Sequence, residues 1–191
     1  MKNPPAKYPE QKLRVLQSNF SLGLMLVGSL ADPKKKEICI KNTVVIREKG
    51  IFFVPSGKTL HIPPGESCYS FDIAGNPNLD FKHAILEFSK MLIRNATIDS
   101  FEALYNYCKE KGIEAHLHSQ LWYRFARLVR NCLTHTQKIH FADYQLKWLP
   151  VSWKGNTIDR SLEGKELPFT IYGYWQTCEL LSEMQKFAET V

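Results

Sequence analysis

The stretch of residues 121–135 constrains the fold most, because it separates apolar from polar side chains with the period of an α-helix. At about 100° per residue, its apolar side chains fall within one arc of roughly 140°. These side chains are Leu121, Trp122, Phe125, Leu128, Val129, Cys132 and Leu133. We expect this arc to face a core, which requires other elements to pack against the helix.

Further segments with helical patterning supply those elements. They are residues 10–31, 79–95, 99–112 and 169–189, and the amphipathic helix itself is expected over 116–135. We expect Asp99 to cap one helix, with Glu102 completing a capping box and Gly112 ending the helix. The sequence therefore predicts a mainly α protein, a bundle of four to five helices.

Residues 33–76 have a different pattern. Short runs of branched and aromatic side chains at 38–40, 44–46 and 51–54 are typical of β-strands, and Gly- and Pro-rich turns separate them. We expect one helical domain over residues 1–191, with 33–76 as a β-containing insertion or flap. A second strand-prone segment follows the amphipathic helix, around Gly155.

Charge and motifs narrow the classes of function. The formal charge of +6, from 25 basic and 19 acidic residues, is compatible with a polyanionic partner such as nucleic acid. The five cysteines form no C-x-x-C pair, and the chain has no phosphate-binding glycine loop, H-E-x-x-H or G-x-S-x-G sequence. No motif joins His116 and His118 to further ligands, so we expect no metal and no cofactor.

The sequence also bears on location. The first ten residues lack the apolar core of a signal peptide. The longest apolar stretch, residues 22–30, is too short to cross a bilayer, which needs about 20 apolar residues. We expect a cytoplasmic protein without a membrane segment.

The face of the helix opposite the apolar arc carries groups suited to a phosphodiester. They are Arg124, Arg127, Arg130, Asn131, Thr134 and His135. An arginine side chain offers a planar fork of donors to phosphate oxygens, and a histidine exchanges protons near neutral pH. Asparagine is a poor helix former, which favours a chemical role for Asn131. A row of arginines is also common on a solvated helix face, so the pattern alone leaves both interpretations open.

Residues 130–135, Arg-Asn-Cys-Leu-Thr-His, match the R-N-x-x-x-H motif, and this part of the chain resembles the HEPN superfamily. The resemblance covers about residues 117–136. It implies a helical bundle that dimerises with two copies of the motif in one cleft. It also implies Arg130 and His135 as the catalytic pair, with Asn131 as polar support.

The resemblance implies a metal-independent endoribonuclease, as in toxins and phage-defence effectors. We expect the RNA 2′-hydroxyl to attack the adjacent phosphorus, with His135 as general acid or base and Arg130 stabilising the phosphoryl oxygens. DNA, which lacks that hydroxyl, would not be cleaved. Arg124, Arg127 and Thr134 would bind the substrate.

Two alternatives stay open. Some HEPN modules bind nucleic acid or a protein partner without catalysis. Others are toxins controlled by an antitoxin of the nucleotidyltransferase type, and then a tyrosine near the motif, Tyr123 or Tyr144, could be modified.

Overall fold

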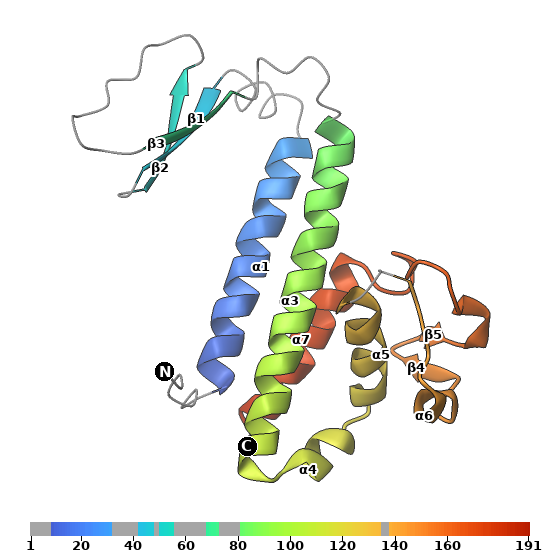
Figure 1. The fold of residues 1–191 in the computed structure, drawn as a ribbon. Coiled ribbons are helices and arrows are strands. Elements are labelled where there is room, and N and C mark those ends of the chain that lie inside the picture. The colour runs from blue at the N-terminus through green and yellow to red at the C-terminus, as the bar shows by residue number, and fades with distance from the viewer. Residues whose placement is uncertain (1–8, 32–41, 48–49, 56–67, 73–80, 135–137) are drawn as a thin grey trace. The chain divides into compact units, whose positions relative to one another are not determined.

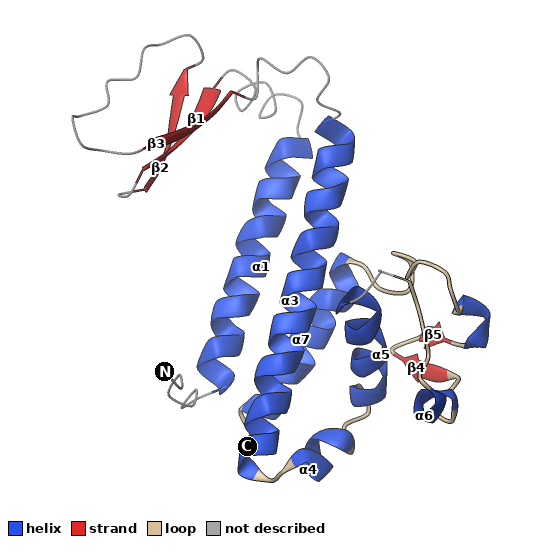
Figure 2. Ribbon diagram, viewed as in Figure 1, coloured by secondary structure: helices blue, strands red, loops and turns tan. Residues whose placement is uncertain are grey.

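The computed structural model describes residues 9–31, 42–47, 50–55, 68–72, 81–134 and 138–191. Most of this part of the chain is helical (Figure 2), which confirms the predicted mainly α fold with a β-containing insertion. The helices are α1 (Pro9–Ala31), α3 (Phe81–Lys111), α4 (Glu114–His118), α5 (Tyr123–Thr134), α6 (Asp143–Leu146) and α7 (Tyr174–Ala188). None of the helices described combines the length and the apolarity that a membrane crossing requires.

The chain divides into two compact units, Gly23–Ser89 and a larger unit of Met1–Leu22 with Lys90–Val191. The smaller unit contains an antiparallel sheet with the strand order β2-β1-β3 (Figure 1). Its strands are β1 (Asn42–Arg47), β2 (Gly50–Pro55) and β3 (Cys68–Asp72). The expected runs at 44–46 and 51–54 are strands, β3 was not expected, and the run at 38–40 lies outside the described residues. The prediction of one domain over residues 1–191 stays a prediction.

Helix α3 is continuous, so the prediction of two helices divided before Asp99 was wrong. Thr97 and Ser100 are buried, and the Thr97 hydroxyl lies 2.7 Å from the hydroxyl of Tyr172 in a buried hydrogen bond. Small polar residues therefore face the core where the sequence pattern indicated a helix end. Asp99 is within the helix rather than at its start, and Glu102 does not complete a capping box.

Gly112 ends α3 as expected. Its φ is +69°, a left-handed conformation that glycine adopts without a side-chain clash. The Gly112 amide donates to the Lys109 carbonyl at 3.2 Å, and the Ile113 amide donates to Cys108 at 2.9 Å. These two bonds form a Schellman motif, which satisfies the last carbonyls of the helix.

The single helix expected over 116–135 is two helices, α4 and α5, with a turn between them. Leu117 and Trp122 are buried on either side of this turn, whereas Leu121 within it is 92% exposed. Leu121 was thus wrongly assigned to the core face. The rest of the apolar arc is buried, and Tyr123 and Ala126 join it.

The core of the larger unit is built from buried side chains of α1, α3, α5 and α7 and of a short hairpin, β4 (Val151–Trp153) and β5 (Asn156–Ile158). Arg14 of α1 pairs with Glu189, just after α7, at 3.0 Å. On α5, the buried Phe125 ring lies 5.4 Å from the ring of Trp153. The hairpin turns at Gly155, where φ is +78°. Strand, turn and helix thus enclose the apolar face of α5.

Helix α7 begins at Tyr174 rather than at the predicted residue 169. The amides of Ile171 and Tyr172 both donate to the Pro168 carbonyl, which forms a turn before the helix. A Cβ atom on Gly173 would lie 2.7 Å from the Phe169 carbonyl oxygen, so only glycine fits at the junction.

Candidate active site

Helix α5 carries residues 130–134 of the candidate motif on a backbone that is fixed at its last turn. Seven of its side chains are buried. The Arg94 guanidinium, from α3, donates from Nε to the Leu133 carbonyl at 2.8 Å. Arg130, Asn131 and Thr134 are partly exposed on the opposite face. His135 follows directly in the sequence and lies outside the described residues.

The Arg130 guanidinium is held between two polar side chains. Its Nη1 donates to Asn131 Oδ1 at 3.0 Å, and its Nη2 forms an ion pair with the Glu102 carboxylate of α3. Its Nε is buried and has no hydrogen-bond partner. The structure therefore brings together two of the three predicted catalytic residues, Arg130 and Asn131, and adds a carboxylate that the sequence analysis placed elsewhere.

Arg127 lies one turn earlier on α5, among aromatic side chains. Its guanidinium donates to the hydroxyl of Tyr123 at 2.7 Å and to that of Tyr144 at 3.3 Å. It also lies 5.5 Å from the centre of the Tyr144 ring and 5.8 Å from that of Trp148. Burial lowers the pKa of Arg127, but the two tyrosines outweigh this effect and leave the pKa above its usual value. Arg127 is a fixed positive charge.

These side chains border a hollow of about 330 Å³. Three helices line it, with Phe101, Glu102 and Tyr105 from α3, Arg127, Arg130 and Asn131 from α5, and Tyr144 from α6. The volume is at the lower end of the range for small-ligand sites, roughly 300–1,000 Å³. The hollow combines two guanidinium groups, one carboxylate and three aromatic rings.

Two predicted substrate-binding residues lie outside the lining of this hollow. Arg124 is exposed, and its guanidinium lies 5.9 Å from the centre of the Trp148 ring. The Thr134 hydroxyl donates to the Arg130 carbonyl at 2.8 Å, so it is engaged with the helix backbone. Of the three, only Arg127 contributes to the hollow.

Four residues that line the hollow were not predicted from the sequence. Phe101 and Tyr105 are four apart on α3, in a segment that was predicted to be helical, and their rings stack at 6.2 Å. Glu102 was assigned to a helix cap, and Tyr144 was noted only as a possible modification target. The i, i+4 aromatic spacing was visible, but nothing local showed that Glu102 would meet Arg130, 28 residues away.

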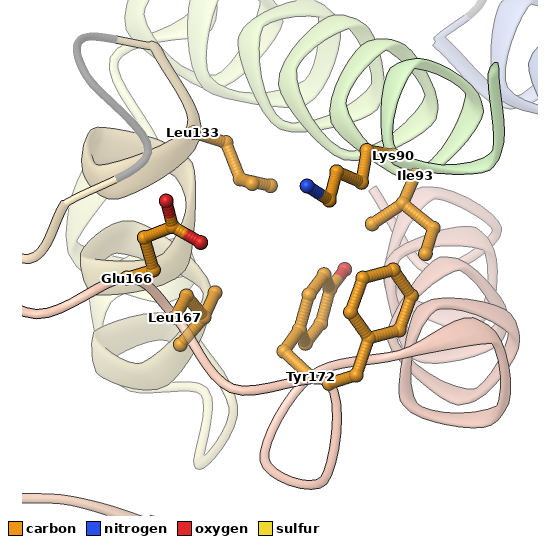
Figure 3. Close-up of a pocket in the computed structure, with 7 residues that line it drawn as sticks. Lys90, Ile93, Leu133, Glu166, Leu167 and Tyr172 are labelled. Atoms are coloured by element: carbon orange, nitrogen blue, oxygen red, sulfur yellow. The ribbon is translucent and has the colours of Figure 1, made fainter. Parts of the chain in front are cut away.

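A smaller cavity of about 60 Å³ lies beside the end of α5. Ile93, Leu133, Leu167, Phe169 and Tyr172 line it, together with the charged side chains of Lys90 and Glu166 (Figure 3). Such a volume holds a few water molecules, since one needs about 10–15 Å³. It is too small for a nucleotide, so the hollow beside Arg130 is the stronger candidate site.

His116 and His118 each have an aromatic neighbour, whereas Nδ1 of His140 lies 3.2 Å from the Glu163 carboxylate. The His116 ring lies 5.1 Å from that of Phe187, and the His118 ring lies 4.6 Å from that of Tyr123. Among the residues that the structure describes, no three His, Cys, Asp or Glu side chains are grouped so that they could hold a metal ion.

The chain was compared with protein-family models, curated proteins and solved structures. No protein-family model matches the chain, and neither a curated protein nor a solved structure is significantly similar to it.

Proposed function

We propose that this chain is a metal-independent endoribonuclease of the HEPN type, which acts as a toxin or phage-defence effector. The observation that carries the proposal is the Arg130 guanidinium, held by Asn131 and Glu102 at a hollow that also contains Arg127. Two guanidinium groups at one hollow suit a phosphate of an RNA strand. Helix α5 itself carries three arginines and no acidic residue.

In the proposed reaction, the RNA 2′-hydroxyl loses its proton and attacks the adjacent phosphorus. The bond from phosphorus to the 5′-oxygen breaks, which leaves a 2′,3′-cyclic phosphate and a free 5′-hydroxyl. His135 transfers protons as general base or acid. Arg130 stabilises the charge that develops on the phosphoryl oxygens, and Asn131 holds the guanidinium in place.

Binding requires a change of partner at Arg130. Glu102 occupies Nη2 of the guanidinium in the free protein. A phosphate oxygen would replace the carboxylate there, and the freed carboxylate would turn to solvent. Both side chains are partly exposed, so this exchange needs no opening of the core.

The same ion pair favours a second function, a non-catalytic HEPN module that binds nucleic acid or a protein partner. An arginine that keeps Glu102 as its partner would serve to join α3 to α5 rather than to act on a phosphate. Arg124, Arg127 and the aromatic rings near them would then supply the binding surface.

The proposal includes a cytoplasmic homodimer in which two motif helices share a cleft, as isologous symmetry allows. A nucleotidyltransferase antitoxin that modifies a tyrosine would have one accessible target of the two considered. Tyr144 is 47% exposed, whereas Tyr123 is 3% exposed and bound to Arg127.

Incubation of the purified protein with single-stranded RNA in EDTA tests the function. We expect cleavage, with a 2′,3′-cyclic phosphate end found by mass spectrometry. The variants Arg130→Ala and His135→Ala should lose activity by at least about 100-fold, the scale of one general acid–base or charge-stabilising group. Arg160→Ala is a matched control, because Arg160 is exposed on a short 3-10 helix (Arg160–Leu162) outside the hollow.

Cleavage that persists in His135→Ala would remove the assignment. Binding of RNA by the wild-type protein without any cleavage would favour the second function.

A further inference from the structure

We propose that the hollow beside Arg130 holds one base of the RNA, stacked on Tyr144, while the neighbouring phosphate lies on Arg127 and Arg130. This inference deepens the proposed function and rests on it, because it names what binds next to the cleaved bond. Tyr144 belongs to a binding subsite and takes no part in the chemical step.

The ring of Tyr144 has the exposure and the support that a stacking platform needs. It is 47% exposed, although it lines the hollow. The Trp148 ring meets it edge to face, with ring centres 5.4 Å apart at 78°, and Arg127 donates to its hydroxyl. A ring fixed in this way loses little conformational freedom when a base stacks on it.

The part of the hollow that α3 lines is also aromatic. Tyr105, from α3, lines the hollow and is stacked on Phe101, with their planes 8° apart. Phe101 is in turn stacked on the buried Tyr123 at 5.8 Å. The wall is therefore a supported stack of rings, and a flat ligand fits such walls better than an aliphatic side chain does.

Charge identifies the flat ligand as part of a nucleic acid. Arg127 and Arg130 lie one turn apart on α5, and both line the hollow. Unpaired RNA bases bind proteins by stacking on aromatic and guanidinium planes while their phosphates meet cationic groups. One base would contact the aromatic rings that line the hollow, and one phosphate would contact its two guanidinium groups.

The test measures binding without cleavage. The probe is a fluorescent single-stranded oligonucleotide with every 2′-hydroxyl methylated, and its abasic counterpart supplies the same phosphates without bases. Tyr144→Ala should weaken binding of the base-containing probe roughly 5- to 150-fold, the range for one stacked base. Binding of the abasic probe should not change, and the dependence of affinity on salt should stay the same, because no phosphate contact is lost.

Three further variants separate stacking from other effects of the substitution. Tyr144→Phe keeps the ring and should bind like the wild type, whereas Tyr144→Leu keeps apolar bulk and should bind like Tyr144→Ala. Trp175→Ala is the control, since Trp175 is an aromatic residue that is 71% exposed and does not line the hollow. It should bind both probes like the wild-type protein.

The inference is overturned if Tyr144→Ala binds the base-containing probe like the wild type, or weakens both probes equally, or if the wild-type protein binds neither. These outcomes differ from a failure of the proposed function. Tyr144-dependent binding without cleavage of unmodified RNA would reject the ribonuclease and keep the base site. Cleavage of unmodified RNA, together with an affinity that does not depend on Tyr144, would keep the ribonuclease and reject the base site.

Discussion

Arg130 and Glu102 join α5 to α3 through an ion pair between side chains that are both partly exposed. The guanidinium has a second partner in Asn131, and its Nε is buried without one. A carboxylate and a phosphate compete for the same nitrogen atoms of an arginine. In the proposed complex, the ion pair would therefore set how readily Arg130 accepts an RNA phosphate.

Glu102→Gln should strengthen RNA binding roughly 1.4- to fivefold, because exchange of a partly exposed ion pair is worth about 0.2–1 kcal/mol. The dissociation constant of the methylated oligonucleotide, measured by fluorescence anisotropy, checks this. Glu110→Gln is the matched control on the same helix, since Glu110 is exposed and does not line the hollow. Weaker binding by Glu102→Gln would show that the carboxylate positions Arg130 rather than competing for it.

Gly112→Ala should lower the free energy of unfolding by about 1–2 kcal/mol, the cost of a left-handed conformation for an L-residue. The cost is conformational, because a Cβ atom on Gly112 would have no neighbour within 4 Å. Urea unfolding followed by circular dichroism measures it. Gly112→Asn should be less costly, and Asn106→Ala, at an exposed position within the same helix, should not destabilise the protein. Equal stability of the alanine variant would contradict the Schellman motif.

Alkaline pH should destabilise the protein through Tyr172. Burial raises the pKa of its hydroxyl to about 12, from the ordinary tyrosine value of 10.0. The folded state thus retains a proton that the unfolded state releases, so the contribution is complete below pH 10 and is lost between pH 10 and 12. The loss is roughly 2–3 kcal/mol, at about 1.4 kcal/mol for each pH unit. Unfolding of Tyr172→Phe should depend less steeply on pH in this window, and parallel curves for the two proteins would contradict the assignment.

Thiol alkylation should distinguish the cysteines of the larger unit. Burial raises the pKa of Cys108 and of Cys132 to about 11, whereas Cys178 is exposed. At pH 8 a thiol of pKa 11 is ionised in about one molecule in a thousand, and only the thiolate reacts. Peptide mapping after treatment with iodoacetamide should find Cys178 modified first and the other two only after unfolding. Early labelling of Cys132 would mean that α5 is not packed as described.

The mainly α fold was predictable where apolar periodicity was strong, as on α1 and α5. The prediction failed at α3, where Thr97 and Ser100 weaken the apolar periodicity, although both are buried and face the core. Local capping rules then favoured a helix end at Asp99. Contacts with Tyr172, far away in the sequence, outweigh that local preference.

The site was predictable only in part, for a similar reason. The sequence indicated Arg127, Arg130 and Asn131 because they share one face of a helix. It could not indicate Glu102 or Tyr144, because their places in the hollow depend on how α3 and α6 pack against α5. His135 stays a prediction that rests on the motif.

The hydrogen bond from Arg94 to the Leu133 carbonyl limits how the backbone of α5 can respond to a ligand. It pins the last turn of α5, the turn that would otherwise fray, while buried side chains hold the rest. Unwinding or rolling of α5 would break this bond and expose buried side chains, so we expect the hollow to adapt to a ligand by side-chain rotation. Amide protons along α5 should exchange with solvent slowly, and at the same rate whether the hollow is empty or filled.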